Sequence, residues 1–283
     1  MKMTDLEITQ AATRYMGKPA LATVLLAIFS VVAWCLMFVL VVQGALHIGI
    51  AFVVVSYLVY SSYTPMHEAV HKNIAGKRRD LIWLNELVGY LVANILGVSY
   101  TMHKAAHMAH HQHTNVRDSD PDFVATGNHL YDLVTGGAKM VISAHQKYFS
   151  RVFPKAALKE KVIVIMEIFA FVGIRVLLAT AYPVETLVLG VLANIAGVTL
   201  LGYVFAWLVH TPFNETERFK DTSTIIMPAF IHGIGTRLWL WQNYHSIHHL
   251  FPRVPFFEYQ NLFEEIKDGM VERGAPMVRL GFA

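Results

Sequence analysis

The chain has 283 residues, of which 55% are hydrophobic and only 15% are charged, and its formal net charge is +3. A soluble domain of this size needs more charged surface, so the composition, with a mean hydropathy of +0.44, predicts an integral membrane protein. The single cysteine, Cys35, excludes a disulfide framework, a cysteine-based zinc site and an iron–sulfur cluster. Because no basic block is interleaved with aromatic residues and no Gly-rich phosphate loop occurs, we expect no nucleic-acid partner.

The N-terminal part begins with a polar, amphipathic segment and continues with two apolar stretches. Residues 1–13 have no small-residue cleavage site after a short apolar region, so we expect no cleavable signal peptide. Residues 19–42 and 45–63 each reach the length of about 20 mostly apolar residues that a helix needs to cross a bilayer. Only a tight turn around Gln43 and Gly44 joins them. The pattern predicts a transmembrane hairpin.

The first histidine pair, His67 and His71, follows the second apolar stretch. Residues four positions apart lie on one face of a helix, so both rings point the same way. A lone pair with this spacing is weak evidence for a metal site, and further histidines are needed to support one. Glu68 lies between the two histidines, and a carboxylate there suits the N–H group of a metal-bound imidazole.

A further apolar stretch, residues 81–102, is long enough to span the membrane but is interrupted by Asn85, Glu86 and Asn94. Each of these side chains is costly when it faces lipid. A full crossing would also place the histidines that follow on the opposite side of the membrane from the first pair, and one metal site could not then use both groups. We therefore expect an interfacial or re-entrant helix, tolerated at depth because protein covers it.

The second histidine cluster comprises His107, His110 and His111, which share one helical face because of their i, i+3, i+4 spacing. Protonated imidazoles packed this closely repel one another, so the cluster indicates metal binding. His103, one turn earlier, and His113, just after, either surround the metal ligands or are simply polar residues near the site. We expect ligand N–H groups to be oriented by His103 and by three carboxylates, Glu68, Asp118 and Asp120.

Two more apolar stretches, residues 162–182 and 186–209, predict a second transmembrane hairpin that turns at Pro183. Arg175 lies in the middle of the third span, two helical turns from Glu167. Two interpretations stay open for these charges within an apolar span. They form an ion pair that faces the bundle interior, or they line a substrate tunnel.

Lysine and arginine residues determine the predicted orientation. The segments before the first span, between the second and third, and after the fourth hold every basic residue except Arg175, and the two hairpin turns hold none. Basic segments stay cytosolic, so we expect both termini, the middle segment and all histidine clusters on the cytosolic side of a bacterial inner membrane. Residues 225–241, rich in Trp and apolar residues, are expected to lie at the membrane interface.

The third histidine cluster repeats the spacing of the second, and one more histidine ends the fourth span. Together they give nine histidines, which are too many for one ion but suit two ions of five or six coordination with room for oxygen or water: His67, His71, His107, His110, His111, His210, His245, His248 and His249. Imidazole binds iron, copper, nickel and zinc, so the ligand type leaves the metal open. The isolated histidines are expected to have ordinary structural roles: His47, His129, His145 and His232.

The order and placement of these motifs resemble the membrane fatty acid desaturase superfamily, which includes desaturases, lipid hydroxylases, and carotenoid-ring hydroxylases and ketolases. The resemblance rests on HxxxH at His67, HxxHH at His107 and HxxHH at His245, and it covers roughly residues 19–259. It implies an all-α bundle of four spans capped by a cytosolic di-iron site, with O2 as oxidant. It also implies that the eight box histidines and His210 hold the two iron ions.

Shorter motifs resemble the carotenoid branch of this superfamily. Residues 118–123 look like the acidic loop of carotenoid-ring ketolases, whereas residues 210–213, Asp221-Thr222 and the tail over 248–256 look like carotenoid hydroxylases. Acyl-CoA desaturases tend to carry Asn one turn before the fourth-span histidine, where this chain has Ala206. The expected activity is hydroxylation or ketolation of a carotenoid-type ring, with fatty-acyl desaturation as the alternative.

Two classes without catalysis remain as alternatives. A His-rich metal transporter would carry its ligands mid-membrane on discontinuous spans, whereas these histidines lie at the ends of spans. A diheme cytochrome would place histidine pairs on facing spans, which contain none. The chain has no cytochrome b5-like heme motif, no flavin or NAD fingerprint and too few cysteines for a ferredoxin. An enzyme that oxidises an apolar lipid would therefore take electrons from an external donor, a ferredoxin or cytochrome with its reductase, and we expect residues 1–283 to form one domain.

Overall fold

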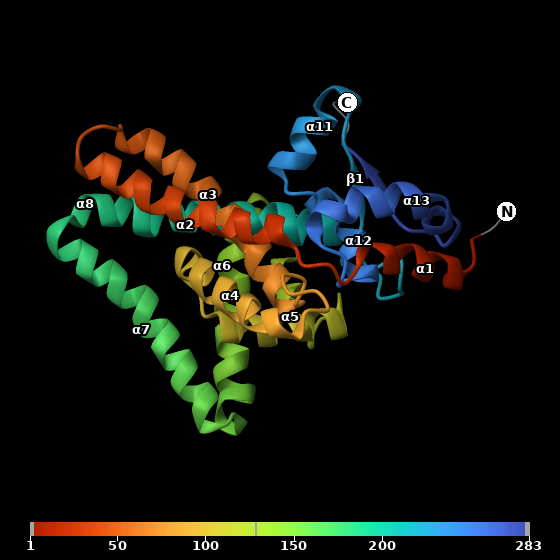
Figure 1. Cartoon of the computed structure of the whole chain (residues 1–283), viewed down its shortest axis with the longest axis horizontal. Coiled ribbons are helices and arrows are strands. Elements are labelled where there is room, and N and C mark those ends of the chain that lie inside the picture. Colours follow the sequence, from red (N-terminus) through yellow and green to blue (C-terminus); the bar gives the residue numbers. More distant parts are fainter. Residues whose placement is uncertain (1–2, 128, 281–283) are drawn as a thin grey trace.

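Four long apolar helices dominate the computed structural model, which describes residues 3–127 and 129–280 (Figure 1). They are α2 (Leu21–Val42), α3 (Ile48–Val70), α7 (Leu158–Ala181) and a continuous helical run over Pro183–His210. The four predicted spans are therefore confirmed. Two of the helices, α3 and α7, run past the predicted apolar stretches, because hydropathy marks where the lipid ends and does not mark where the helix ends.

α3 is the central helix of the bundle. In its most apolar window 56% of the helix is buried inside the protein, compared with 17% for α2 and 6% for α7. Large apolar side chains of the two outer helices stay exposed, such as Phe29 and Phe169. Because helices with this much exposed apolar surface need an apolar solvent, α2 and α7 face lipid along most of their length. The predicted all-α membrane fold is thus confirmed.

The fourth span contains two π-helical segments on the way to His210. It consists of α8 (Pro183–Glu185), the π-helical η5 (Thr186–Leu192), α9 (Ala193–Leu201), the π-helical η6 (Gly202–Trp207) and α10 (Leu208–His210). In η6, Gly202 lies against Gly137 of the crossing helix α6 (Leu130–Lys147), and a Cβ atom at Gly202 would lie 2.4 Å from the Gly137 nitrogen. The missing side chain lets α6 lie directly on the fourth span.

The fifth apolar stretch folds as two helices where one was expected. The 3-10 turn η1 (Arg79–Leu81) leads into α4 (Ile82–Leu96), and α5 (Tyr100–His113) follows at an angle of 98°. The break has a local cause. Gly97 takes a left-handed conformation (φ 68°) that favours glycine, and the Ser99 side chain accepts a hydrogen bond from the Met102 backbone N–H.

The bent pair returns to the end of the bundle from which it left. His71 before the pair and His107 within it contact each other through ring nitrogens 2.8 Å apart, which agrees with the expected re-entrant course.

Arg175 and Glu167 of α7 lie beside the bend, and the expected ion pair between them is wrong. Arg175 donates to carbonyl oxygens at the end of α4, and Glu167 accepts from groups at the start of α5. Neither residue lines the large cavity described below.

Most of the remaining elements form a cap at one end of the bundle, called the histidine end because all histidine clusters lie there. In chain order the cap contains α1 (Asp5–Tyr15), η2 (Pro121–Ala125), β1 (Thr224–Ile226), α11 (Ala229–Leu238), η7 (Gln242–Tyr244), α12 (His245–Leu250), η8 (Phe256–Glu258), α13 (Tyr259–Glu272) and β2 (Met277–Arg279). α6 packs on the fourth span instead, and η3 (Tyr148–Val152) and η4 (Phe153–Lys155) connect it to α7 (Figure 1). The two short strands pair in parallel. The first and last described elements, α1 and β2, lie at the histidine end and both hairpin turns lie at the other, as the charge pattern predicts (Figure 1).

One contact within the cap and one between the cap and a span hold it in place. α1 begins with a capping box of Thr4 and Glu7 and packs on α13, where the Asp5 carboxylate contacts the Arg273 guanidinium at 2.5 Å. α11, within the segment expected at the membrane interface, is held at its end by the Tyr57 hydroxyl of α3, which donates to the main-chain oxygen of Leu238 (2.9 Å). The cap therefore rests on the sides of the spans as well as on their ends.

Candidate metal centre

Nine histidines converge at the histidine end, and four separate elements bring them there. α3 carries His67 in its last turn with His71 immediately after it, and α5, α10 and α12 supply the others: His107, His110, His111, His210, His245, His248 and His249. The i, i+4 spacing of the α3 pair and the i, i+3, i+4 spacing in α5 and α12 place the rings of each element on one face. Seven of the nine residues are buried, and His111 and His249 are half-buried.

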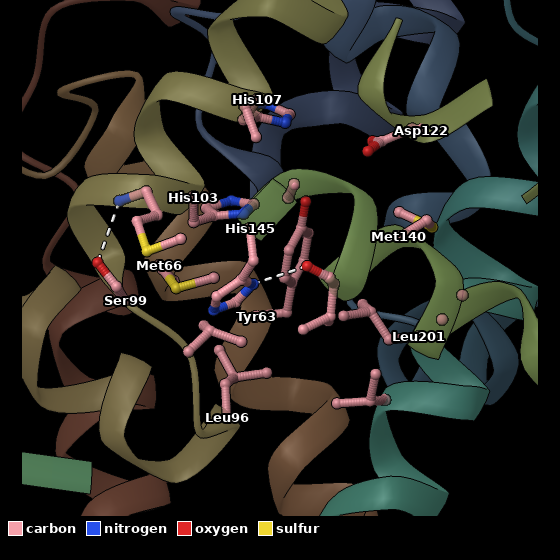
Figure 2. Close-up of a pocket in the computed structure, with 18 residues that line it drawn as sticks. Tyr63, Met66, Leu96, Ser99, His103, His107, Asp122, Met140, His145 and Leu201 are labelled. Atoms are coloured by element: carbon pink, nitrogen blue, oxygen red, sulfur yellow. Dashed lines mark hydrogen bonds between the residues drawn. The ribbon is translucent and has the colours of Figure 1, made fainter. Parts of the chain in front are cut away.

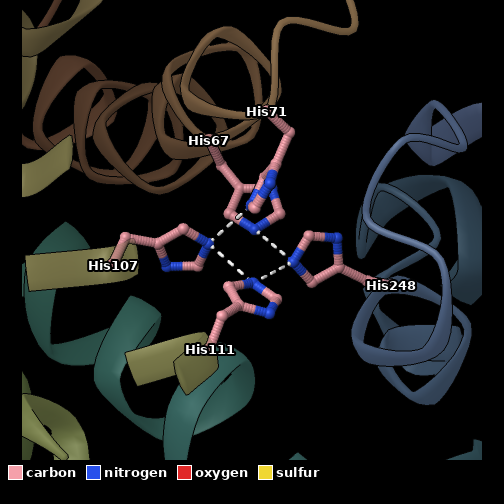
Figure 3. A group of neighbouring side chains, drawn as sticks. All are labelled: His67, His71, His107, His111 and His248. Atoms are coloured by element: carbon pink, nitrogen blue, oxygen red, sulfur yellow. Dashed lines mark hydrogen bonds between the residues drawn. The ribbon is translucent and has the colours of Figure 1, made fainter. Parts of the chain in front are cut away.

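Five of these histidines direct ring nitrogens toward a common point (Figure 3). The His248 Nε2 atom lies 2.9 Å from that of His67 and 2.7 Å from that of His111. The His107 Nε2 atom lies 2.8 Å from that of His71 and 3.0 Å from that of His111. Nitrogens bound about 2.1 Å from one ion and at right angles to one another are about 3 Å apart, so these residues fit a single metal ion.

The other four histidines lie beside this group. Ligand nitrogens of His110, His210 and His249 lie within 4.8 Å of one another, and the His245 Nε2 atom lies 3.2 Å from that of His249. The ring centroids of His110 and His111, one from each group, are 5.7 Å apart. The donor set therefore fits a second ion close to the first.

In several of these rings the Nδ1 atom contacts a carboxylate or hydroxyl group of another residue. The His110 Nδ1–H group donates to the Asp120 carboxylate (2.8 Å). His249 Nδ1 lies 3.5 Å from the Asp221 carboxylate, and His248 Nδ1 lies 3.0 Å from the Tyr259 hydroxyl. Such partners fix the tautomer and the orientation of a metal-binding imidazole.

Sequence reasoning misses Asp221, Tyr259 and Gln242 as partners of the rings. Gln242 lies one turn before His245 and 3.4 Å from its Nδ1 atom, so the helical spacing could have indicated it. Asp221 belongs to a motif noted only for its family resemblance. Tyr259 reaches His248 from the next helix, and nothing in its local sequence marks it.

The residues expected to surround the ligand histidines lie in different environments. Asp118 is exposed on its loop, and among the described contacts it makes none with a histidine of either group. Glu68 is fully buried and accepts a hydrogen bond from the Asn73 side chain (3.2 Å), and it lies beside Tyr259, whose hydroxyl contacts His248. His103 stacks 5.5 Å from the His107 ring and lines the cavity, whereas His113 is exposed.

The isolated histidines have ordinary contacts in the described part of the chain. His47 caps α3 by accepting from the Gly49 backbone N–H, and His232 contacts the Tyr244 hydroxyl (2.9 Å). His145 donates to the Val141 main-chain oxygen within α6 (2.7 Å). His129 directly precedes α6, at the N-cap position. None of the four belongs to the two groups of ring nitrogens described above.

Burial keeps most of the clustered imidazoles neutral. It lowers the pKa of His71 to about 3 and that of His111 to about 2, and it lowers the pKa values of the three α12 histidines well below their usual value. Burial also acts on His110, but the carboxylates of Asp122 and Asp120 outweigh it, so the pKa of His110 is raised. Neutral imidazole is the form that binds metal, so most of the rings are prepared for an ion at neutral pH.

An apolar pocket adjoins the histidines (Figure 2). Met, Leu, Val, Ala and Gly residues of α3, the α4–α5 bend, α6 and the fourth span form most of its lining. A smaller pocket shares Tyr63, His107 and Asp122 with it and extends to His210 and His245. The two cavities place an apolar space beside both groups of ring nitrogens.

Comparisons with known proteins agree with this arrangement. A fatty acid desaturase family model matches residues 44–281, which is most of the chain. A beta-carotene ketolase and beta-carotene 4-ketolase 3, both of Haematococcus lacustris, are each 34% identical to the chain over 82 residues, which is 29% of this chain. The match spans only 25% of the length of each of these relatives. From the family model, the chain belongs to the fatty acid desaturase family.

Proposed function

We propose that the protein uses O2 and two iron ions, held by the nine histidines, to oxidise an unactivated C–H bond of an apolar lipid. The observation that carries the proposal is the apolar cavity that adjoins two neighbouring groups of ring nitrogens. Such a cavity suits a substrate with no polar group near the reacting carbon. Membership of the desaturase family supports iron over the other metals that imidazole binds.

The two groups of histidines suggest how the ions are held. One ion would be bound by the five converging rings: His67, His71, His107, His111 and His248. The other would be bound by the rings beside them: His110, His210, His245 and His249. Neutral ligands leave two cations with little compensation, and the nearby carboxylates of Asp120, Asp122 and Asp221 offset part of that charge.

Bound iron would supply the oxidising power for C–H cleavage, with O2 as co-substrate and two electrons from outside the chain. The protein's own residues have other tasks. Asp120, Asp221 and Tyr259 hold the rings in one orientation, so that the ligand nitrogens are in place before substrate arrives. The apolar lining excludes water and holds one carbon of the substrate beside the ions.

For the substrate, we propose a carotenoid-type ring that is hydroxylated or ketolated. The matched relatives are named beta-carotene ketolases, and the ketolase-like residues 118–123 supply Asp120 and Asp122 beside His110. Ala206 is buried and lines the smaller cavity with a methyl group, where acyl-CoA desaturases tend to carry an amide. Fatty-acyl desaturation is the second candidate, favoured by the family description.

The orientation and the electron donor belong to the same proposal. Because the hairpin turns hold no Lys or Arg, we place the histidine end in the cytosol of a bacterium, with the chain in its inner membrane as one domain. An external ferredoxin or cytochrome with its reductase would supply electrons there. A metal transporter is disfavoured because the ring nitrogens lie at the ends of the spans and not in the middle of them.

Expression in a carotenoid-accumulating bacterium tests the proposal, with pigments and fatty acids both analysed by mass spectrometry. We expect new hydroxylated or ketolated carotenoids in cells with the wild-type chain and none in cells with His248→Ala. New double bonds in fatty acids, without changed pigments, would replace the first candidate with the second. If neither lipid class changes while an intact, metal-loaded protein is present, the proposed activity is wrong.

A further inference from the structure

The bend between α4 and α5 lies against α7 and leaves helix ends that need partners. Carbonyl groups at the end of α4 and N–H groups at the start of α5 have no partners within their own helices. Water cannot supply partners inside a bilayer, so protein must. α7 provides two charged side chains at this position, Arg175 and Glu167, which are eight residues apart and therefore about 12 Å apart along the helix.

The Glu167 carboxylate binds the start of α5 at two points. Its Oε2 atom accepts from the Ser99 hydroxyl (2.7 Å), and its Oε1 atom accepts from the Thr101 backbone N–H (3.2 Å). The Ser99 oxygen in turn accepts from the Met102 backbone N–H (3.1 Å). A carboxylate is favourable at the N-terminus of a helix because the helix dipole is positive there.

The Arg175 guanidinium binds the end of α4 in the opposite sense. Its Nη2 atom donates to the main-chain oxygens of Asn94 (3.1 Å) and Ile95 (3.2 Å), and the Asn194 side chain also donates to the Ile95 oxygen (2.7 Å). A cation is favourable at the C-terminus of a helix, where the dipole is negative. Each charge of α7 therefore matches the helix end that it contacts, which explains why an apolar span carries both.

We infer that Glu167 is a positioning residue: by capping α5 it holds the second histidine cluster where the metal-binding nitrogens of the other clusters can reach it. α5 is one uninterrupted helix from Tyr100 to His113, so its first turn sets the direction of His107 and His111. α7 is otherwise little buried, and besides these capping hydrogen bonds it contacts α5 through a small apolar cluster that includes Met102 and Val164. The consequence for metal binding rests on the proposed function, whereas the cap itself does not.

Three variants and one control test this inference in the purified full chain. Glu167→Ala removes both hydrogen bonds, Glu167→Gln keeps an oxygen for the Thr101 N–H group without the charge, and Ser99→Ala removes the hydroxyl alone. Glu185→Ala is the control, because Glu185 is a half-buried acid at the far end of the same hairpin, away from α5. Hydrogen–deuterium exchange of the backbone amides around Thr101 reports the cap, and release of metal to a chelator reports the position of the cluster.

We expect the amides around Thr101 to exchange about tenfold faster in Glu167→Ala, and metal release to accelerate by a similar factor, as the usual strength of a helix cap suggests. Glu167→Gln and Ser99→Ala should lie between this variant and the wild type, and they keep the test open if Glu167→Ala does not fold. Unchanged exchange in Glu167→Ala would overturn the cap. Faster exchange with unchanged metal release would overturn the positioning role. A wild-type chain that holds no metal would overturn the proposed function, while the exchange measurement would still decide the cap.

Discussion

Asp120 and Asp118 lie two residues apart in one acidic loop, and the structure predicts opposite results for their substitution. The Asp120 side chain is fully buried. It accepts hydrogen bonds from His110 Nδ1–H, from the Asn115 backbone N–H and from the Asp122 backbone N–H, each at 2.8 Å. Asp118 is exposed, and no contact between it and a ligand histidine occurs in the described part of the chain. Sequence alone gave the two carboxylates the same role.

Replacing Asp120 by Ala leaves one buried and one partly buried backbone N–H group without acceptors and releases the His110 ring. Each buried donor left unpaired costs about 1–3 kcal/mol, so we expect Asp120→Ala to lose about 4 kcal/mol of stability. That loss corresponds to a melting temperature lower by roughly 10 °C for a chain of this size. Because the ring also loses its orienting partner, metal affinity at this group should fall by about 10–100-fold.

The assay compares Asp120→Ala, Asp120→Asn and Asp118→Ala in detergent, by thermal unfolding and by metal retention against a chelator. Asp120→Asn keeps one acceptor oxygen and should lose about half as much stability as Asp120→Ala. Asp118→Ala should stay within about 0.5 kcal/mol of the wild type, as exposed substitutions usually do. Equal losses for Asp118→Ala and Asp120→Ala would refute the assignment of Asp120 as the partner of His110.

Three further predictions concern the site, the topology and the pH. His107→Ala removes a ring from the five-histidine group, so metal content and lipid oxidation should both be lost, and full activity would remove this residue from the site. Cysteines placed at Gln43 and at Pro183 should react with an impermeant reagent from outside the cell and one at Gly127 should not, and outside labelling of all three would contradict a cytosolic site. The metal-free protein should lose stability as pH falls below about 6.5, because the pKa of His71 is lowered to about 3 and the unfolded chain takes up the proton first. At pH 5 this residue alone contributes a loss on the order of 2 kcal/mol, and equal thermal stability at pH 7.5 and pH 5 would contradict it.

The membrane spans could be predicted from the sequence because hydropathy reports directly on the solvent that a helix needs. The course of residues 81–102 could be predicted only in part. The histidines on either side of it required a return to the same side, but the bend depends on Gly97 and on partners from α7, about 70 positions further along the chain. For the same reason Arg175 and Glu167 suggested a pair, when each in fact binds a helix end.

The nine histidines of the candidate site could also be identified from the sequence, since their helical spacing is local information. Their division into groups of five and four could not, because His67 of α3 meets His248 of α12 only in the folded chain. Burial separates Asp120 from Asp118, and no pattern in the loop reports burial. Tyr259 shows the same limit, because it reaches His248 from the following helix.

Metal analysis of the purified chain tests the central claim most directly. Protein purified from iron-supplied cells, with the metal quantified per chain by mass spectrometry, should contain two iron ions and show no heme absorbance. Removal of one ring from the five-histidine group, as in His248→Ala, should lower that number while the chain stays folded. Exchangeable zinc in place of iron, a single ion per chain, or heme absorbance would contradict a di-iron centre.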